Sequence, residues 1–265
     1  MKKTCCVGLC LLLAGNVIAQ HEWMIYERLP DADVAYIREQ YKDPEKFKES
    51  LMSSFSSSQF LWPEQVPLYK EKFGITDDTL RTALMGIYQS VLHLGKDGFS
   101  KEDSDELAKD KSRLLNSIEW LGYCADESVK RLLLDIANDD TKAECYRIYA
   151  IGAYVDCANA EDIRAGFPLL LASKKQDVPF VYRKAMYVYD RTKEGTQKRE
   201  AILTTVATAL MKEENKEIFA VADGGLAARS KEYANSPQRK AALQRMNVPL
   251  PPELEEQKKP WWKLW

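Results

Sequence analysis

The sequence of 265 residues contains 38 lysine and arginine residues and 40 aspartate and glutamate residues, and its formal net charge at pH 7 is −2. Nucleic-acid-binding domains usually carry a strongly basic surface, so this balance argues against a nucleic-acid partner. The length suits one large domain or a short array of repeats, and only two histidines, His21 and His93, are present to support histidine-based chemistry.

The first 19 residues have the layout of a secretory signal peptide. Lys2 and Lys3 give a positive start, residues 7–14 are an apolar run, and Val-Ile-Ala at residues 17–19 offers a cleavage site after Ala19. The apolar run is too short to cross a bilayer as a helix, which needs about 20 residues. We therefore expect residues 1–19 to be removed.

Removing the first 19 of 265 residues would leave 246 residues, and the loss of two lysines would move the formal charge from −2 to −4. The Met-Lys-Lys start is bacterial in style, so we expect the protein in the periplasm or secreted from the cell. A lipid anchor at Cys10 is the less favoured alternative, because this cysteine lies inside the apolar run rather than just after it.

The chain after Ala19 keeps three cysteines, Cys124, Cys145 and Cys157. An odd number in an exported protein is compatible with three buried thiols, with one disulfide plus a free thiol, or with a reactive thiol. Since all three lie among apolar neighbours, small buried side chains are the favoured interpretation. A Cys124–Cys157 disulfide and a reactive thiol stay open.

Residues 20–75 read as an N-terminal helical cap. Asp31 is placed to cap a helix that runs to about Tyr41. Asp43-Pro44 then puts a proline at the first position of a second helix, where its missing N–H group is not needed. That helix runs into the serine-rich residues 53–58, and two prolines follow before the next helical region.

Strand patterns are nearly absent from the sequence. No sustained apolar and polar alternation is found, and no Asn-Gly or Asp-Gly hairpin links β-branched runs. From Leu80 onward, apolar residues recur at helical spacing, in stripes over residues 80–94, 114–121, 129–136, 145–152, 163–171, 185–189, 202–210 and 218–225. The fold class we expect is all-α.

The loop of residues 93–106 contains one Asp-Gly pair, which invites comparison with a calcium loop. With Gly98 at the sixth place of an EF-hand loop, His93 takes the first place and Ser104 the twelfth, so required oxygen ligands are missing. Ser100 or Ser104 is better placed as the cap of the next helix. No metal site is expected here.

The stripes give a rough internal repeat, because a helix recurs at Ala83, Ser117, Ile148, Ala185 and Ile218, at steps of 34, 31, 37 and 33 residues. Periods in this range are typical of helix-pair solenoids. Residues 125–140 and 160–173 look like second helices of HEAT-like repeats, and Pro168 stands where such helices often carry a proline. The sequence of residues 76–246 therefore resembles a HEAT-like helical repeat domain.

The resemblance implies a right-handed α-solenoid of helix pairs, with an irregular helical bundle as the alternative. It also implies that Asp140 with Arg147, and Asp177 with Arg183, help to tie neighbouring repeats together. The pattern departs from the family in the last unit, where residues 224–225 are Gly-Gly.

Stacked helix pairs bury a shared core and leave a long concave surface, which in solenoids usually binds proteins or peptides. In HEAT-like arrays the second helices line that surface. Basic residues on these helices are interpreted first as solvated charges of the outer face, and a basic binding groove is the alternative if several of them point inward: Lys130, Arg131, Arg164, Lys174, Lys175, Lys198 and Arg199.

Residues 247–265 form a Pro/Trp-rich C-terminal tail, which contains Trp261, Trp262 and Trp265. Tryptophan is frequent at the energetic centres of interfaces, and three lysines lie between residues 258 and 263. We expect the tail to dock in a partner's groove, to contact a membrane surface, or to fold back on its own repeats.

Residues for catalysis are scarce. No Gly-x-Ser-x-Gly, His-x-x-x-His or Cys-x-x-Cys sequence occurs, and His93 reads as a structural or surface residue. No catalytic residue, metal or cofactor is expected. The favoured function is an exported helical-repeat adaptor that binds a protein or peptide, and the alternative is a cell-envelope carbohydrate-active enzyme that uses paired carboxylates.

Overall fold

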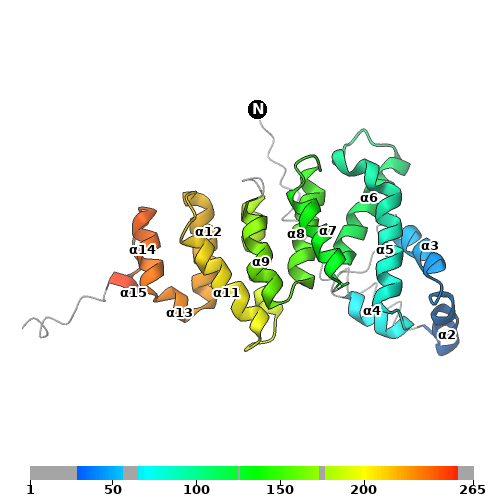
Figure 1. The fold of residues 1–265 in the computed structure, drawn as a ribbon, viewed down its shortest axis with the longest axis horizontal. Helices are drawn as coiled ribbons and strands as arrows, with labels where there is room; N and C mark the ends of the chain where they lie inside the picture. The colour runs from blue at the N-terminus through cyan, green and yellow to red at the C-terminus, as the bar shows by residue number, and fades with distance from the viewer. Residues whose placement is uncertain (1–28, 56–64, 125, 173–176, 256–265) are drawn as a thin grey trace, which may run out of the picture. The chain divides into compact units, whose positions relative to one another are not determined.

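The computed structural model describes residues 29–55, 65–124, 126–172 and 177–255, and within these ranges the chain forms helices and no strand (Figure 1). The predicted all-α class is confirmed. The chain divides into two compact units: unit 1 comprises residues 1–133 and 141–153, and unit 2 comprises residues 134–140 and 154–265. This division falls inside the region 76–246, and the solenoid arrangement of that region stays a prediction.

The first helices of unit 1 are α2 (Asp31–Gln40), α3 (Pro44–Phe55) and α4 (Val66–Phe73). The predicted cap at Asp31 is wrong, because Pro30 occupies the N-cap position and Asp31 lies in the first turn. Helix α3 begins at Pro44 as predicted, and the Glu45 N–H donates to the Asp43 side chain at 3.0 Å.

The core of unit 1 is built around α5 (Asp77–Val91) and α6 (Asp105–Leu121), which pack against each other and against α3 (Figure 1). The predicted apolar stripes of α5 and α6 are buried at Leu80, Leu84 and Ile87, and at Leu114 and Ile118. A 3-10 helix, η2 (Leu92–Lys96), follows α5. The Ser104 hydroxyl accepts from the Leu107 N–H, which confirms the predicted cap of α6.

Two further helices contribute residues to both units. Helix α7 (Glu127–Asn138) gives residues 127–133 to unit 1, and α8 (Glu144–Cys157) gives residues 144–153 to it. The buried positions on α8 include Tyr146 and Ala150. The sequence had placed Cys145 and Ile148 on that face, and the structure leaves both partly exposed.

A buried lysine holds the loop between η2 and α6. The Lys111 ammonium donates to the Gly98 carbonyl at 2.7 Å and to the Asp103 carboxylate at 2.8 Å. The hydrogen bond from Lys111, with one from the Ser100 N–H, lowers the pKa of Asp103 below its ordinary value. This loop is the one compared above with a calcium-binding loop. Its Asp103 carboxylate forms an ion pair with Lys111 of the next helix, α6.

Lys111→Met is expected to lower the melting temperature of unit 1 by roughly 5 °C or more at pH 7, because it leaves a buried carboxylate without its cation. The lowered pKa of Asp103 means that this stabilisation is present above the ordinary aspartate pKa and is lost as pH falls through the folded-state value. The difference from wild type in thermal melts followed by circular dichroism should therefore shrink between pH 7 and pH 3.

Lys109→Met is the matched control on the same helix, because the Lys109–Glu106 pair is exposed and such pairs contribute little. An equal loss of stability in the two variants would contradict the role of Lys111.

Unit 2 is organised around α9 (Ala160–Leu171), α10 (Val178–Arg191), α11 (Gln197–Leu210) and α12 (Lys216–Arg229). Helix α9 packs against α11 (Figure 1), and α10 packs against α9, α11 and α12. Asn159 begins α9 with a capping box, in which its side chain accepts from the Asp162 N–H and the Asp162 carboxylate accepts from the Asn159 N–H. These four helices carry the site described below.

The buried face of α12 differs from the prediction by one position. Phe219, Ala222 and Leu226 are buried, whereas Val221, which was expected inside, is 61% exposed. The error arose because the sequence of α12 alternates small and large apolar residues around the helix and offers two competing stripes.

Helices α13 (Lys231–Ala234), α14 (Pro237–Arg245) and α15 (Pro252–Glu255) complete unit 2. The buried Asp223 carboxylate of α12 joins α12, α13 and α14. It accepts from the Tyr233 hydroxyl at 2.9 Å and from two nitrogens of the Arg239 guanidinium, Nε and Nη2, each at 3.0 Å. Burial, with the charge of Asp223 next, raises the pKa of Tyr233.

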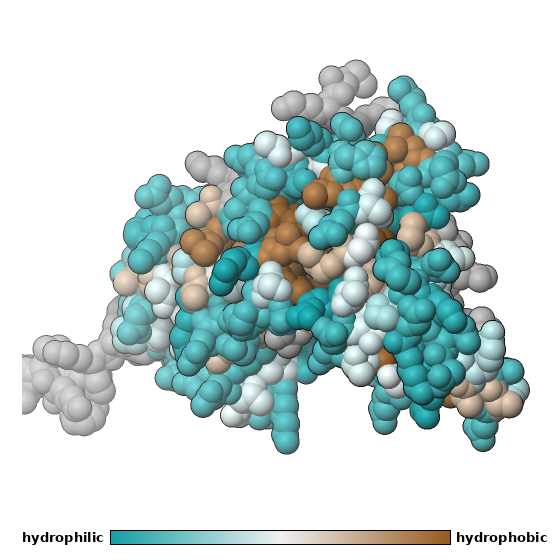
Figure 2. Space-filling model, turned by 45° about the vertical axis from the view of Figure 1, so that its right-hand side comes forward, coloured by the Kyte–Doolittle hydropathy of each residue, from teal (hydrophilic) through white to brown (hydrophobic). Residues whose placement is uncertain are grey.

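Figure 2 shows hydrophilic residues over most of the face that it displays, with apolar residues in patches. Within the described ranges, no helix combines the length and the apolar character that crossing a bilayer requires.

Candidate functional site

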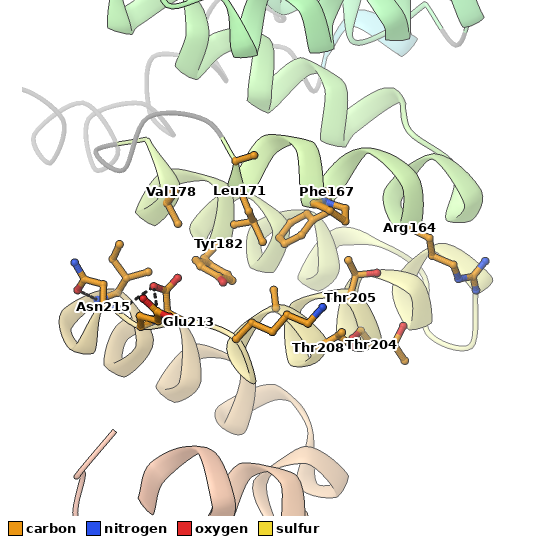
Figure 3. Close-up of a pocket in the computed structure, with 16 residues that line it drawn as sticks. Arg164, Phe167, Leu171, Val178, Tyr182, Thr204, Thr205, Thr208, Glu213 and Asn215 are labelled. Atoms are coloured by element: carbon orange, nitrogen blue, oxygen red, sulfur yellow. Dashed lines mark hydrogen bonds between the residues drawn. The ribbon is translucent and has the colours of Figure 1, made fainter. Parts of the chain in front are cut away.

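A cavity of about 730 Å³ lies within unit 2, between α9, α10, α11 and the start of α12 (Figure 3). Small-molecule and cofactor pockets usually measure about 300–1,000 Å³, and combine apolar walls with a few placed polar groups. The cavity has both features, and its walls come from segments between residues 164 and 218.

One wall of the cavity is apolar and is supplied by α9 and α10. Phe167 and Leu171 come from α9, and Val178 and Tyr182 come from α10. The rings of Phe167 and Tyr182 meet edge to face, with centroids 6.1 Å apart. Since Phe167, Val178 and Tyr182 are themselves largely buried, this wall is fixed by the packing of the two helices.

The facing wall is a row of threonines on α11, at positions 204, 205 and 208. The Thr204 hydroxyl donates to the Glu200 carbonyl at 2.9 Å, and the Thr208 hydroxyl donates to the Thr204 carbonyl at 2.8 Å. These hydroxyl protons are thus used within the helix. A ligand on this side meets threonine methyl groups and hydroxyl oxygens that accept hydrogen bonds.

The two ends of the cavity differ in charge. Arg164 and Thr204 lie at one end, and Glu213 and Asn215 lie at the other, with Leu171 and Tyr182 between them (Figure 3). Lys212 and Glu214, from the segment between α11 and α12, also border the cavity. The cavity therefore has a basic end and an acidic end joined by an apolar wall.

The acidic end is fixed by local hydrogen bonds. The Glu213 carboxylate accepts from the Glu214 N–H at 3.1 Å and from the Asn215 N–H at 2.9 Å. Burial raises the pKa of Tyr182, and the charge and hydrogen bond of Glu213 raise it further. The Asn215 side chain caps α12 by accepting from the N–H groups of Glu217 and Ile218.

The carboxylates of the cavity are not arranged as a facing pair. Glu213 and Glu214 are consecutive in one loop, and the first of them closes the turn. Glycoside hydrolysis needs two carboxyl groups on opposite sides of the scissile bond, and Figure 3 shows no glutamate or aspartate among the labelled residues of the α9 wall. The cavity is therefore suited to bind an apolar group along its wall, with charged side chains of the protein at each end.

The remaining candidate groups for chemistry lie elsewhere. His93 is exposed on η2, and the described residues contain no cluster of three or more His, Cys, Asp or Glu side chains suited to a metal ion. All three cysteines are free thiols, so the alternative of a Cys124–Cys157 disulfide is not realised in this structure. Burial raises the pKa of Cys124 to about 12, which keeps it protonated.

Several residues expected in the basic groove are engaged in contacts of their own. Lys130 is buried and pairs with Glu127, whereas Arg131 is exposed. Lys198 donates to the Asp156 carbonyl at 2.8 Å, and burial lowers its pKa. Arg199 stacks over the Tyr189 ring at 4.2 Å.

Of the seven basic residues, Arg164 alone is among the described residues that line the cavity. Lys174, Lys175, Trp261, Trp262 and Trp265 lie outside the described residues.

The residues expected to tie the repeats together are placed differently from one another. The Arg147 guanidinium is buried and donates to the Lys142 carbonyl at 2.6 Å. Asp177 is fully buried at the start of α10, whereas Arg183 is exposed on the same helix. Burial of Arg147 and Asp177 agrees with a structural role for both.

No family model matches the chain, and neither a curated protein nor a solved structure matches it.

Proposed function

We propose that this chain is an exported helical-repeat binding protein, which engages a segment of another protein or a peptide in the cavity of unit 2. The observation that carries the proposal is the combination of an apolar wall with a basic end and an acidic end. A segment with an apolar or aromatic anchor between charged residues complements this arrangement.

Binding in the cavity would gain free energy from the burial of apolar surface and would gain direction from the charged ends. An aromatic side chain that enters the cavity exchanges water for Phe167, Leu171 and Tyr182, and each Å² of apolar surface buried contributes about 25 cal/mol. The charged ends then set the direction of the segment, because a wrong orientation places like charges together. Since the wall residues are held by packing, little ordering of the site opposes binding.

The proposal extends to fold and location. The resemblance to HEAT-like repeats supports a solenoid of helix pairs, which exposes a continuous surface for a partner. The signal-peptide layout of residues 1–19 supports export. The exported adaptor is favoured over a carbohydrate-active enzyme because the cavity carboxylates share one loop.

Selection of random displayed peptides on the full chain tests the proposal. We expect enriched peptides to carry an aromatic residue beside lysine, and to bind at least tenfold more weakly to Thr208→Arg, which fills the cavity with a bulky cation. Thr208 is exposed on α11, so the substitution should not disturb the core. Ala220→Arg, an exposed position of α12 that does not line the cavity, is the control.

Selected peptides that bind wild type and Thr208→Arg alike would contradict the assignment of the cavity. Release of reducing ends from envelope polysaccharide by the wild-type chain would instead favour the enzyme.

A further inference from the structure

The chain that follows α14 passes close to the acidic end of the cavity. The Arg245 guanidinium at the end of α14 donates to the Leu210 carbonyl at 3.2 Å, and the Lys216 ammonium donates to the Asn247 carbonyl at 3.1 Å. Leu210 and Lys216 flank the loop that carries Glu213 and Glu214. Two independent contacts thus fix residues 245–247 beside this loop.

Near the end of the described residues, Leu254 is buried, and its carbonyl accepts from the Lys240 ammonium at 2.9 Å. Lys240 precedes Arg245 by five residues on α14, a rise of about 7.5 Å. With the two side chains added, Leu254 lies within roughly 27 Å of Leu210. Residues 255–265 span up to about 36 Å when extended, so they reach the cavity.

The residue types of this segment, and their order along the chain, match the charged and apolar parts of the cavity. Residues 258–265 read Lys-Lys-Pro-Trp-Trp-Lys-Leu-Trp. The two lysines come first along the chain, and their charge is opposite to that of Glu213 and Glu214. Trp261 and Trp262 follow, and tryptophan combines a large apolar surface with a ring suited to edge contacts with Phe167 and Tyr182.

We propose that residues 258–265 bind in the cavity of unit 2 of the same molecule, with the lysines at Glu213 and Glu214 and the tryptophans against the α9 and α10 wall. The segment is an internal ligand, and an external partner must displace it. This inference rests on the cavity assigned under the proposed function. A short tether gives an effective concentration on the order of mM, so only partners that bind well occupy the site.

A synthetic, fluorescently labelled peptide of residues 256–265 tests the proposal by fluorescence anisotropy. The two proteins compared are the full chain and the full chain with Trp261→Ser, Trp262→Ser and Trp265→Ser, called the triple variant. We expect the peptide to bind the triple variant roughly tenfold or more tightly than wild type, because the tethered segment competes only in wild type.

Glu214→Lys in the triple variant should weaken peptide binding several-fold, since it reverses a charge at the acidic end. Glu194→Lys makes the same change at an exposed position that does not line the cavity, and it should leave binding unchanged. Equal weakening by both substitutions would overturn the assigned orientation.

Equal peptide affinity for wild type and the triple variant would overturn the proposal, as would a dimer of wild type that the triple variant loses, because the segment would then bind a second copy. If the peptide fails to bind the triple variant while library peptides still bind in the cavity, only this inference is rejected. Library peptides that ignore Thr208→Arg reject the proposed function itself.

Discussion

Gly166→Ala is expected to destabilise unit 2 by about 2–3 kcal/mol, because the new methyl group would overpack a closed site. A Cβ at Gly166 would lie 2.5 Å from Cζ of Tyr154 and closer still to the tyrosine hydroxyl oxygen. The Tyr154 ring is buried, and its hydroxyl donates to the Asp162 carbonyl at 2.7 Å. The ring therefore cannot move aside without losing that hydrogen bond.

Hydrogen exchange measured on peptides of α9 reports the free energy of opening, and peptides of unit 1 serve as the internal reference. Gly224→Ala is the matched control, because nothing lies within 4 Å of a Cβ at that helical position. We expect this change to stabilise α12 by about 0.5–1 kcal/mol, since alanine favours helix over glycine.

A double-mutant cycle sharpens the test. In a Tyr154→Leu background the obstructing ring is absent, so Gly166→Ala should cost clearly less than it does in wild type. An equal cost in the two backgrounds would show that the contact with Tyr154 is not the cause.

Arg239→Met is expected to destabilise unit 2 by about 3–5 kcal/mol, because it leaves the buried Asp223 carboxylate without its cation. The Asp223 and Arg239 side chains are only 7% and 12% exposed, and Tyr233 alone would remain as a donor to the carboxylate. Urea unfolding monitored by circular dichroism, with hydrogen exchange of α14 peptides, measures the loss.

Arg229→Met provides a control of the same chemistry at a different depth. The Arg229 guanidinium also donates two hydrogen bonds to an aspartate, Asp190, from Nη2 at 2.6 Å and from Nε at 2.8 Å. Both of these side chains are substantially exposed. Exposed pairs contribute up to about 1 kcal/mol. If Arg229→Met costs as much as Arg239→Met, burial is not what makes the Asp223 network important.

The sequence was sufficient to predict features that depend on local physics. A proline at the first turn and a serine cap depend on neighbours along the chain, and both the start of α3 at Pro44 and the Ser104 cap were predicted correctly. Strong apolar stripes, such as the one through Leu80 and Leu84, also identify the buried face. The stripe of α12 failed because small residues around the helix made two faces similar, and Val221 was placed inside.

The cavity could not be predicted because its walls come from four helices that meet only after packing. A local trace of it exists in the three threonines of α11, which interrupt the apolar second part of that helix, residues 201–210, at positions 204, 205 and 208. Arg164 was the one predicted basic residue that borders the cavity among those described. Lys198 and Arg199 were expected at a groove, yet the structure ties them to Asp156 and Tyr189.

The internal ligand and the external partner make one connected account. A cavity with an apolar wall and charged ends would attract unrelated apolar peptides if it were always open. Occupation of the cavity by residues 258–265 raises the affinity that a partner needs. The reason is that the apparent dissociation constant equals the intrinsic constant divided by the fraction of molecules whose cavity is free. Changes in the Trp-rich segment should then alter affinity for every partner of the cavity by the same factor.

Photo-crosslinking in native cells tests the central claim most directly. A photoreactive amino acid replaces Thr205, which lines the cavity, or Glu194, which does not, in the triple variant, so that the chain's own segment does not compete. The account predicts a covalent adduct with one defined protein or peptide segment at position 205 and none at position 194. Adducts of equal yield and composition at both positions, or no adduct at position 205, would contradict it.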